Sequence, residues 1–255
     1  MTTLRGRHAL VTGGNRGIGA EVARQLAAQG ADITLLVRTP ASAAPVVAEL
    51  TTLGVRARVV QADVTDRAQV AAACHEAIAN APVDILVNNA GTAETAPFLK
   101  SDAALFERML AMHLLGPVAA AQAVLPGMVE RGQGWVVNVA SVAGLRGGRY
   151  IAAYVAAKHA MVGLTRALAE EFGPQGIHVN AVCPGFVDTD LVSAAVQRLV
   201  DKTGRTANAA RDAILAESGQ ARLLTSAEVA RQVVALCQPG VTASGTAEPL
   251  MGETA

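Results

Sequence analysis

The sequence predicts an α/β fold of one domain, a doubly wound parallel sheet with helices on both faces. Short apolar runs alternate with amphipathic helical patterns along the whole chain of 255 residues. Hydrophobic residues make up 51% of the chain and aromatic residues only 3%, which suits buried strands covered by helices with small contact residues. Because no shift in composition marks a second unit, residues 1–255 are expected to form a single domain.

The first strand, expected over 7–11, runs directly into a glycine-rich loop, Thr12-Gly-Gly-Asn-Arg-Gly-Ile-Gly19, and then into a helical pattern over 21–29. In such a unit the glycines permit a tight turn, and the helix N-terminus offers unpaired N–H groups to phosphate. The pattern predicts a Rossmann-type dinucleotide site. The residues of this loop expected to bind the cofactor are Gly13, Asn15, Arg16, Gly17, Ile18 and Gly19.

The second strand, expected over 32–37, ends at Arg38, where the adenosine ribose of a dinucleotide would lie. An acidic residue there would bind the 2′-hydroxyl of NAD, whereas Arg38 together with Arg16 suits a 2′-phosphate. The sequence therefore favours NADPH/NADP+ over NADH. The alternative is that both arginines are solvated surface residues.

The following elements continue the alternation and place polar residues at strand ends. Asp66 is expected to cap the third helix. Because the carboxyl ends of parallel strands share one edge, the residues after the third and fourth strands are expected near the ligand. The expected elements are helix 45–53, strand 55–61 ending at Asp63-Val64, helix 66–80, strand 83–87 ending at Asn88-Asn-Ala-Gly91, helices over 101–115 and on through 128, and strand 134–139.

Ser141 follows the fifth strand, and Tyr154 and Lys158 lie four residues apart in the next helical pattern. At that spacing the two side chains share one helix face, one turn apart. An ammonium near a phenol favours the phenolate, so Lys158 is expected to lower the pKa of Tyr154 toward the range of a general acid or base. On the spacing alone, an ordinary helix face is the alternative.

After a sixth strand over 177–183, which ends at Pro184-Gly185, the chain lacks strand patterns between 186 and 222. Helical pieces are expected there over 190–201 and 207–217. An insertion of this length over a ligand crevice predicts a substrate lid, and a surface helical hairpin is the alternative. A last helix is expected over 226–236, and the tail from 241 is expected to supply a final strand.

Composition argues against several other classes. The chain carries 21 basic and 21 acidic residues, so nothing predicts binding to nucleic acid or to an anionic membrane. Three scattered cysteines and five dispersed histidines predict reduced thiols and no metal site. The N-terminus lacks the apolar region of a signal peptide, and no segment is expected to reach the roughly 20 apolar residues that span a bilayer. A soluble, cytoplasmic protein is therefore expected.

Taken in order, these motifs resemble the short-chain dehydrogenase/reductase family over nearly the whole chain, with Asn180 and Pro184-Gly-x-x-x-Thr189 completing the set. The resemblance implies that Ser141 orients the substrate oxygen, that Tyr154 transfers its proton, and that Lys158 tunes the phenol and holds the nicotinamide ribose. It implies that Asp63 contacts the adenine and Thr189 the nicotinamide amide. The further cofactor contacts that it implies are Val64, Asn89, Ala90, Gly91, Tyr154, Lys158, Pro184, Gly185 and Val187.

Two departures from the family pattern affect these expectations. His113 stands where relatives usually carry an Asn that helps hold a water in the proton relay, so His113 is a candidate relay member. A packed helix histidine is the alternative. The C-terminus reads Glu248-Pro-Leu-Met-Gly-Glu253 in place of an Asp-Gly-Gly-like turn. A homo-oligomer, a tetramer by family analogy, is expected.

The expected activity is reversible, NADPH-dependent reduction of a ketone to a secondary alcohol. The stretches over 180–189 and 222–230 resemble the 3-oxoacyl thioester and polyketide ketoreductase branch, which makes β-keto thioesters the first substrate class. The insertion also resembles the lids of 3-hydroxybutyrate and other small-alcohol dehydrogenases, so oxidation of a secondary alcohol or 3-hydroxy acid stays open. Arg146 and Arg149 could bind an anionic group or face solvent. A catalytically silent, nucleotide-sensing protein is the alternative from another class.

Overall fold

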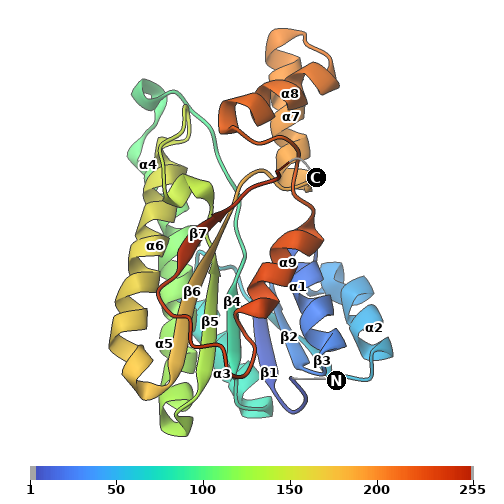
Figure 1. Cartoon of the computed structure of the whole chain (residues 1–255), viewed down its shortest axis with the longest axis vertical. Helices are drawn as coiled ribbons and strands as arrows, with labels where there is room; N and C mark the ends of the chain where they lie inside the picture. Colours follow the sequence, from blue (N-terminus) through green and yellow to red (C-terminus); the bar gives the residue numbers. More distant parts are fainter. Residues whose placement is uncertain (1–3, 254–255) are drawn as a thin grey trace.

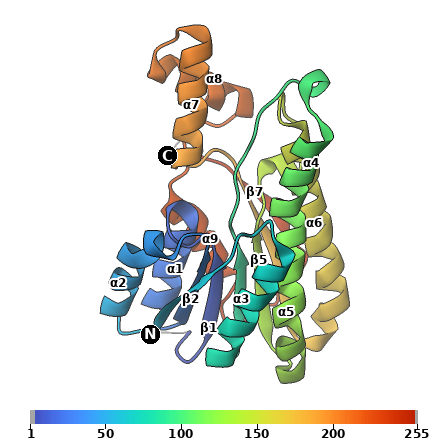
Figure 2. The same cartoon turned by 180° about the vertical axis from the view of Figure 1, so that it is seen from behind.

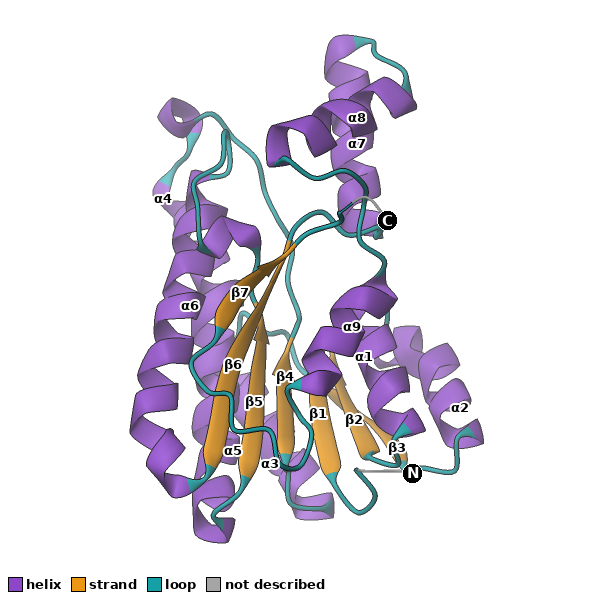
Figure 3. Cartoon of the chain, viewed as in Figure 1, coloured by secondary structure: helices purple, strands orange, loops and turns teal. Residues whose placement is uncertain are grey.

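The computed structural model describes residues 4–253 and contains one sheet of seven parallel strands (Figures 1 and 3). The strand order is β3-β2-β1-β4-β5-β6-β7. The strand order therefore switches between β1 and β4: β2 and β3 are added on one side of β1, and β4 to β7 are added on the other. This order confirms the doubly wound prediction. The strands are β1 (His8–Thr12), β2 (Asp32–Val37), β3 (Ala57–Gln61), β4 (Ile85–Asn88), β5 (Gly134–Val139), β6 (Ile177–Pro184) and β7 (Ala247–Leu250).

Helices cover both faces of the sheet, as predicted: α1, α2 and α9 lie on one face, and α3 and α5 lie on the other (Figures 1 and 2). Helix α1 begins at Gly17 rather than Glu21, because Gly17 has a positive φ of 53° that turns the loop directly into the helix. The helices are α1 (Gly17–Ala28), α2 (Ala44–Thr52), α3 (Arg67–Asn80), α4 (Ala103–Leu110), α5 (Gly116–Arg131), α6 (Ala152–Phe172), α7 (Asp190–Thr203), α8 (Ala207–Ser218) and α9 (Ser226–Ala235).

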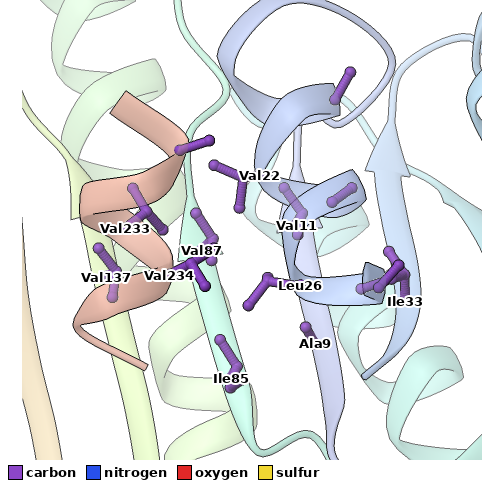
Figure 4. Close-up of a cluster of buried hydrophobic side chains, with 14 of the residues drawn as sticks. Ala9, Val11, Val22, Leu26, Ile33, Ile85, Val87, Val137, Val233 and Val234 are labelled. Carbon is purple, nitrogen blue, oxygen red and sulfur yellow. The ribbon is translucent and has the colours of Figure 1, made fainter. Parts of the chain in front are cut away.

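The core consists of two apolar layers, one on each side of the sheet. Side chains alternate along β1, so Val11 packs with α1 and α9 while Leu10 packs with the layer under α3 and α5. Figure 4 shows the first layer, in which Leu26 of α1 and Val233 of α9 meet the strand side chains. Full burial of a side chain such as Leu10 contributes roughly 1.5–3 kcal/mol to the stability of the fold. The packing of the two layers therefore fixes the positions of the strand ends.

Residues Ala103–Arg131 form one continuous helical stretch, in which a π-helical turn over Ala111–Leu115 joins α4 to α5. By length and composition this stretch could cross a membrane, so the expectation that no segment is apolar enough was wrong. Half of its apolar window is buried inside the protein, and Ala120, Val124 and Met128 lie in the core. The apolar character is thus explained by packing against the sheet.

The segment 186–222 contains α7 and α8, which project beyond the carboxyl ends of the strands (Figure 1). Both helices were predicted, each within two residues of its observed end. The segment returns to the body at Leu224, which forms an isolated parallel bridge with Val187. The tail supplies the predicted final strand, β7, which pairs with β6.

Candidate active site

Ser141, Tyr154 and Lys158 meet at the carboxyl end of β5, which is the end of the sheet where α7 and α8 lie. Ser141 follows β5 and begins a short 3₁₀ turn, with its hydroxyl accepting a 3.1 Å hydrogen bond from the Ala143 N–H. Tyr154 and Lys158 lie one turn apart on α6, as the spacing predicted. The Ser141 hydroxyl lies close enough to the Tyr154 phenol to lower its pKa, so the two groups adjoin.

The phenol of Tyr154 is held in its protonated form. Burial raises the pKa of Tyr154 to about 12 and outweighs the lowering effect of the Ser141 hydroxyl. The ammonium of Lys158 lies 5.7 Å from the centre of the tyrosine ring, over its face. The shift of the Tyr154 pKa arises from burial and from Ser141 and not from Lys158, so the expected lowering by Lys158 is not seen.

Lys158 is one of the most buried charged residues of the described chain, with 4% of its surface exposed. Its Nζ donates a 2.8 Å hydrogen bond to the Val139 carbonyl, the last carbonyl of β5. Burial lowers the pKa of Lys158 to about 7. The amine is thus anchored on the strand that leads to Ser141 and titrates near neutrality, as a group taking part in proton transfer should.

His113 lies beside the phenol, in the π-helical turn between α4 and α5. The ring packs edge-on against Tyr154, with centres 5.2 Å apart and planes at 86°. Its Nε2 donates a 2.7 Å hydrogen bond to the Thr92 carbonyl, and its buried Nδ1 has no partner within residues 4–253. Burial and the nearby Lys158 charge lower the pKa of His113 to about 3, so the ring stays neutral. Gly91 gives the ring room, because a Cβ there would collide with it.

A buried polar chain that the sequence reasoning missed ties α6 to the sheet. Asn138 of β5 accepts a 2.9 Å hydrogen bond from the Asn88 side chain of β4 and donates one of 2.9 Å to the Thr165 hydroxyl of α6. Buried polar groups in a satisfied network specify one arrangement of the elements that carry them. The signal available in the sequence was Asn138 itself, a polar residue within an apolar strand.

The glycine loop and the Asn88–Gly91 turn are joined through Thr12. The Thr12 hydroxyl accepts hydrogen bonds from the N–H groups of Asn89 (2.9 Å) and Ala90 (3.0 Å), and the Asn89 amide donates to the Thr12 carbonyl (3.0 Å). A Cβ on Gly13 would lie 2.9 Å from the Ala90 Cα, and one on Gly19 would collide with the Gly13 carbonyl. The two turns therefore form a rigid cradle that excludes side chains.

This cradle fits the phosphates of a dinucleotide. Helix α1 starts with no side-chain cap among the described residues, so its first N–H groups and its positive dipole end face the loop. The positive φ angles of Gly13 and Gly17, 66° and 53°, let the backbone bend around such a group. The side chain of Asn15 donates to the hydroxyl of Ser42 (3.1 Å), which lies in a 3₁₀ turn after β2.

The two arginines predicted to bind a 2′-phosphate are both exposed and both paired. Arg38, at the end of β2, lies 3.8 Å from Asp63. Arg16 pairs with Asp190, the first residue of α7, at 3.0 Å, and the two side chains are 74% and 78% exposed. Exposed pairs of this kind contribute about 0–1 kcal/mol, so an incoming phosphate can replace either carboxylate. The link from Arg16 to α7 was not foreseen from the sequence.

The segment from Pro184 to Thr189 runs past the same cradle. The Gly185 N–H donates to the Leu250 carbonyl of β7 (2.9 Å), and the Thr189 hydroxyl donates to the Val187 carbonyl (3.2 Å). A Cβ on Gly17 would lie 3.6 Å from the Thr189 side chain, which places the two predicted cofactor segments in reach of each other. Asn180, by contrast, is structural: it bonds Ala243 and Thr246 and fixes the approach to β7.

Within residues 4–253 no group of three His, Cys, Asp or Glu side chains is placed to hold a metal ion. Cys74, Cys183 and Cys237 are buried and free. The carboxyl end of the sheet combines a backbone cradle of a size and charge that suit phosphate with a protonated phenol, which is the combination that an NAD(P)-dependent dehydrogenase or reductase requires.

The chain belongs to the short chain dehydrogenase family, whose family model matches residues 7–199. It is 42% identical to a galactitol 2-dehydrogenase (L-tagatose-forming) of Cereibacter sphaeroides over 190 residues, 74% of each chain. It is 34% identical to a D-beta-hydroxybutyrate dehydrogenase of Cupriavidus necator over 243 residues, 90% of this chain and 94% of the relative. Among solved structures, a variant of actinorhodin polyketide ketoreductase with NADPH matches with a TM-score of 0.91 at 34% identity, covering 96% of each chain.

Proposed function

We propose that this enzyme uses NADPH to reduce a ketone reversibly to a secondary alcohol. The observation that carries the proposal is the protonated Tyr154 phenol, adjoining Ser141 beside a phosphate cradle. In the proposed reaction the Ser141 hydroxyl orients the carbonyl oxygen and Tyr154 gives that oxygen its proton. The bound cofactor supplies the hydride. A phenol that is protonated near neutral pH suits the reductive direction, since the oxidative direction needs a phenolate as base.

The proposed substrate is a β-keto acyl thioester or another small or medium ketone. The similarity to a polyketide ketoreductase supports this class. The similarity to a hydroxybutyrate dehydrogenase supports the alternative, oxidation of a secondary alcohol or 3-hydroxy acid. We also propose that the protein is cytoplasmic and forms a homo-oligomer, a tetramer by family analogy. Light scattering of the purified protein gives its molar mass and so the number of subunits.

We assign the 186–222 segment the role of substrate lid. Its contacts with the loop that precedes Tyr154 support this role: the Arg146 guanidinium donates to the Ser218 carbonyl of α8, and the Lys202 ammonium of α7 lies 5.8 Å from the centre of the Tyr150 ring. Because the Arg146 guanidinium is already bonded to the Ser218 carbonyl, an anionic group of the substrate would meet Arg149 more readily. Arg149 is exposed.

A substrate panel tests the proposed activity. NADPH absorbance is followed with simple ketones, diketones, β-keto esters and β-keto thioesters, and the alcohols are tested with NADP+ in the reverse direction. Turnover of at least one ketone with formation of the alcohol is expected. Tight NADPH binding with no turnover on any member would instead favour a nucleotide-sensing protein.

The cofactor preference is tested at Arg38. Arg38→Asp is expected to lower the ratio of kcat/KM with NADPH to kcat/KM with NADH by roughly 10-fold or more, because a charge-assisted bond to the 2′-phosphate is replaced by repulsion. Arg231→Asp, the same change at an exposed position of α9, is the control and should leave the ratio unchanged. An unchanged ratio in Arg38→Asp, or a wild-type enzyme that uses NADH at least as well, contradicts the assignment.

We further propose that His113 holds a water of the proton relay behind Lys158. The Nε2–H of His113 is committed to the Thr92 carbonyl, so the ring cannot pass a proton through that nitrogen. Its buried Nδ1 is a free acceptor within the described residues and can receive a hydrogen bond from water. His113 would therefore anchor the relay rather than shuttle protons itself.

Two substitutions test this role. His113→Ala is expected to lower kcat by roughly 10-fold, about 1.4 kcal/mol, and to change its pH profile, because the relay water loses its acceptor and Thr92 its donor. His113→Asn keeps an amide donor and acceptor and should retain more of the activity. The pH dependence of kcat is measured for both, and an unchanged kcat and profile in both variants would remove His113 from the relay.

A further inference from the structure

Gln220 joins the two ends of the 186–222 segment through one buried side chain. It lies two residues before the end of the segment, and only 5% of its surface is exposed. Its Oε1 accepts a 2.8 Å hydrogen bond from the Phe186 N–H, while its Nε2 donates to the carbonyls of Phe186 (2.8 Å) and Arg222 (2.7 Å). Both polar atoms of the Gln220 amide are thus bonded to backbone groups, at the residue where the segment leaves the body and at the residue where it returns.

The backbone around this amide leaves no room for side chains. A Cβ on Gly185 would collide with the Gln220 Oε1, and a Cβ on Gly252 would collide with the Arg222 carbonyl and lie 3.1 Å from the Gln220 Nε2. The N–H groups of Ala221 and Arg222 also donate to the Gly252 carbonyl, at 3.0 and 3.3 Å. The C-terminal tail, which departs from the family pattern, therefore closes around Gln220.

The base of the segment is fixed to α9 as well. The Arg222 guanidinium forms an ion pair with Glu228, and Glu228 also completes the capping box of α9 with Thr225. Because the Gln220 amide is buried among these groups, water cannot replace a hydrogen bond that it loses, so each lost bond destabilises the base of the segment.

From this base the segment reaches both halves of the active site. Three residues beyond Phe186, Thr189 approaches the glycine loop at Gly17, and Asp190 then pairs with Arg16. Near its other end, the Ser218 carbonyl accepts from Arg146 of the loop that leads to Tyr154. A shift at the base would displace both sets of contacts together.

We propose that Gln220 is a positioning residue, whose amide clamps the base of the 186–222 segment and so sets the place of Thr189 and α7 over the active site. The expected change in KM rests on the proposed reductase function, whereas the expected change in the conformation of the segment does not. The conformation of the segment can be measured without any turnover, so failure of the clamp and failure of the proposed activity are distinguishable.

The test compares Gln220→Glu with Gln197→Glu. Glutamate keeps the size of the side chain but turns the Nε2 donor group into an oxygen that faces two carbonyls. Gln197 is an exposed glutamine on α7 of the same segment, so its substitution is the matched control. Gly252→Ala is a second variant, in case Gln220→Glu does not fold. Its added Cβ would collide with the Arg222 carbonyl beside the Gln220 amide.

The first readout is limited trypsin digestion, with and without NADPH, because α7 and the turn after it carry the exposed sites Arg198, Lys202 and Arg205. Cleavage within 186–222 is expected to be at least ~10-fold faster in Gln220→Glu and Gly252→Ala, while the rest of the chain resists. KM for the ketone should rise at least ~5-fold with a smaller change in kcat, and Gln197→Glu should match the wild type. Unchanged cleavage and KM in both clamp variants, or cleavage spread over the whole chain with a collapsed Tm, overturns the proposal.

Discussion

Replacing Tyr154 by Phe is expected to lower kcat for ketone reduction by roughly 10²–10⁴-fold, the range that positioned proton transfer supplies. The substitution removes only the hydroxyl. The ring keeps its edge-on packing against His113 and its place under the Lys158 ammonium, so the fold and NADPH affinity should change little. Single-turnover reduction measured at saturating NADPH gives the loss, and fluorescence titration gives the affinity.

The chain offers a matched control, because Tyr150 is its only other tyrosine. Tyr150 is 60% exposed and lies four residues before Tyr154, at the edge of the proposed lid. Tyr150→Phe should retain kcat within about 2-fold, since its ring still faces Lys202. If Tyr154→Phe retained wild-type kcat, or if both variants lost activity equally, the phenol of Tyr154 would not be the proton donor.

The second large effect is expected in the cofactor cradle. A Cβ on Gly19 would collide with the Gly13 carbonyl and the Asn89 amide, which are parts of the two turns that Thr12 joins. Overpacking of this kind costs about 1–3 kcal/mol, so Gly19→Ala should raise the Kd for NADPH roughly 5- to 150-fold. Isothermal titration of the purified variant measures the Kd.

The same substitution at Gly163 serves as the control. Gly163 lies within α6, and a Cβ there would meet no other atom within 4 Å. Gly163→Ala should leave the Kd unchanged and raise the free energy of unfolding by about 0.5–1 kcal/mol, because alanine loses less entropy in a helix. Equal Kd values for Gly19→Ala and Gly163→Ala would show that the cradle does not bind the cofactor.

Local patterns were enough to predict most of the fold. Strands β5 and β6 are recognisable because Val136 and Val179 lie in short, mostly apolar stretches, as buried parallel strands require. The glycine loop and the four-residue spacing of Tyr154 and Lys158 also have a fixed geometric meaning. These features depend on neighbours in the sequence, which is why the sequence alone could predict them.

Effects that depend on distant residues could not be predicted in the same way. The low pKa of Lys158 arises from burial, and its hydrogen bond to Val139 turns the amine toward β5. Arg16 meets Asp190 across 174 positions, and Gln220 clamps Phe186 across 34. Such contacts are set by the packing of whole elements, and no short motif indicates them.

The most direct test of the central claim is the transfer of deuterium from the cofactor. Wild-type enzyme is given a ketone that the panel identifies and NADPH deuterated at C4 of the nicotinamide, with each of the two C4 epimers in turn. One epimer should place deuterium on the carbinol carbon of the alcohol, while Tyr154→Phe should form that product roughly 10²–10⁴-fold more slowly. An alcohol that carries no deuterium from either epimer would contradict carbonyl reduction by hydride transfer at this site.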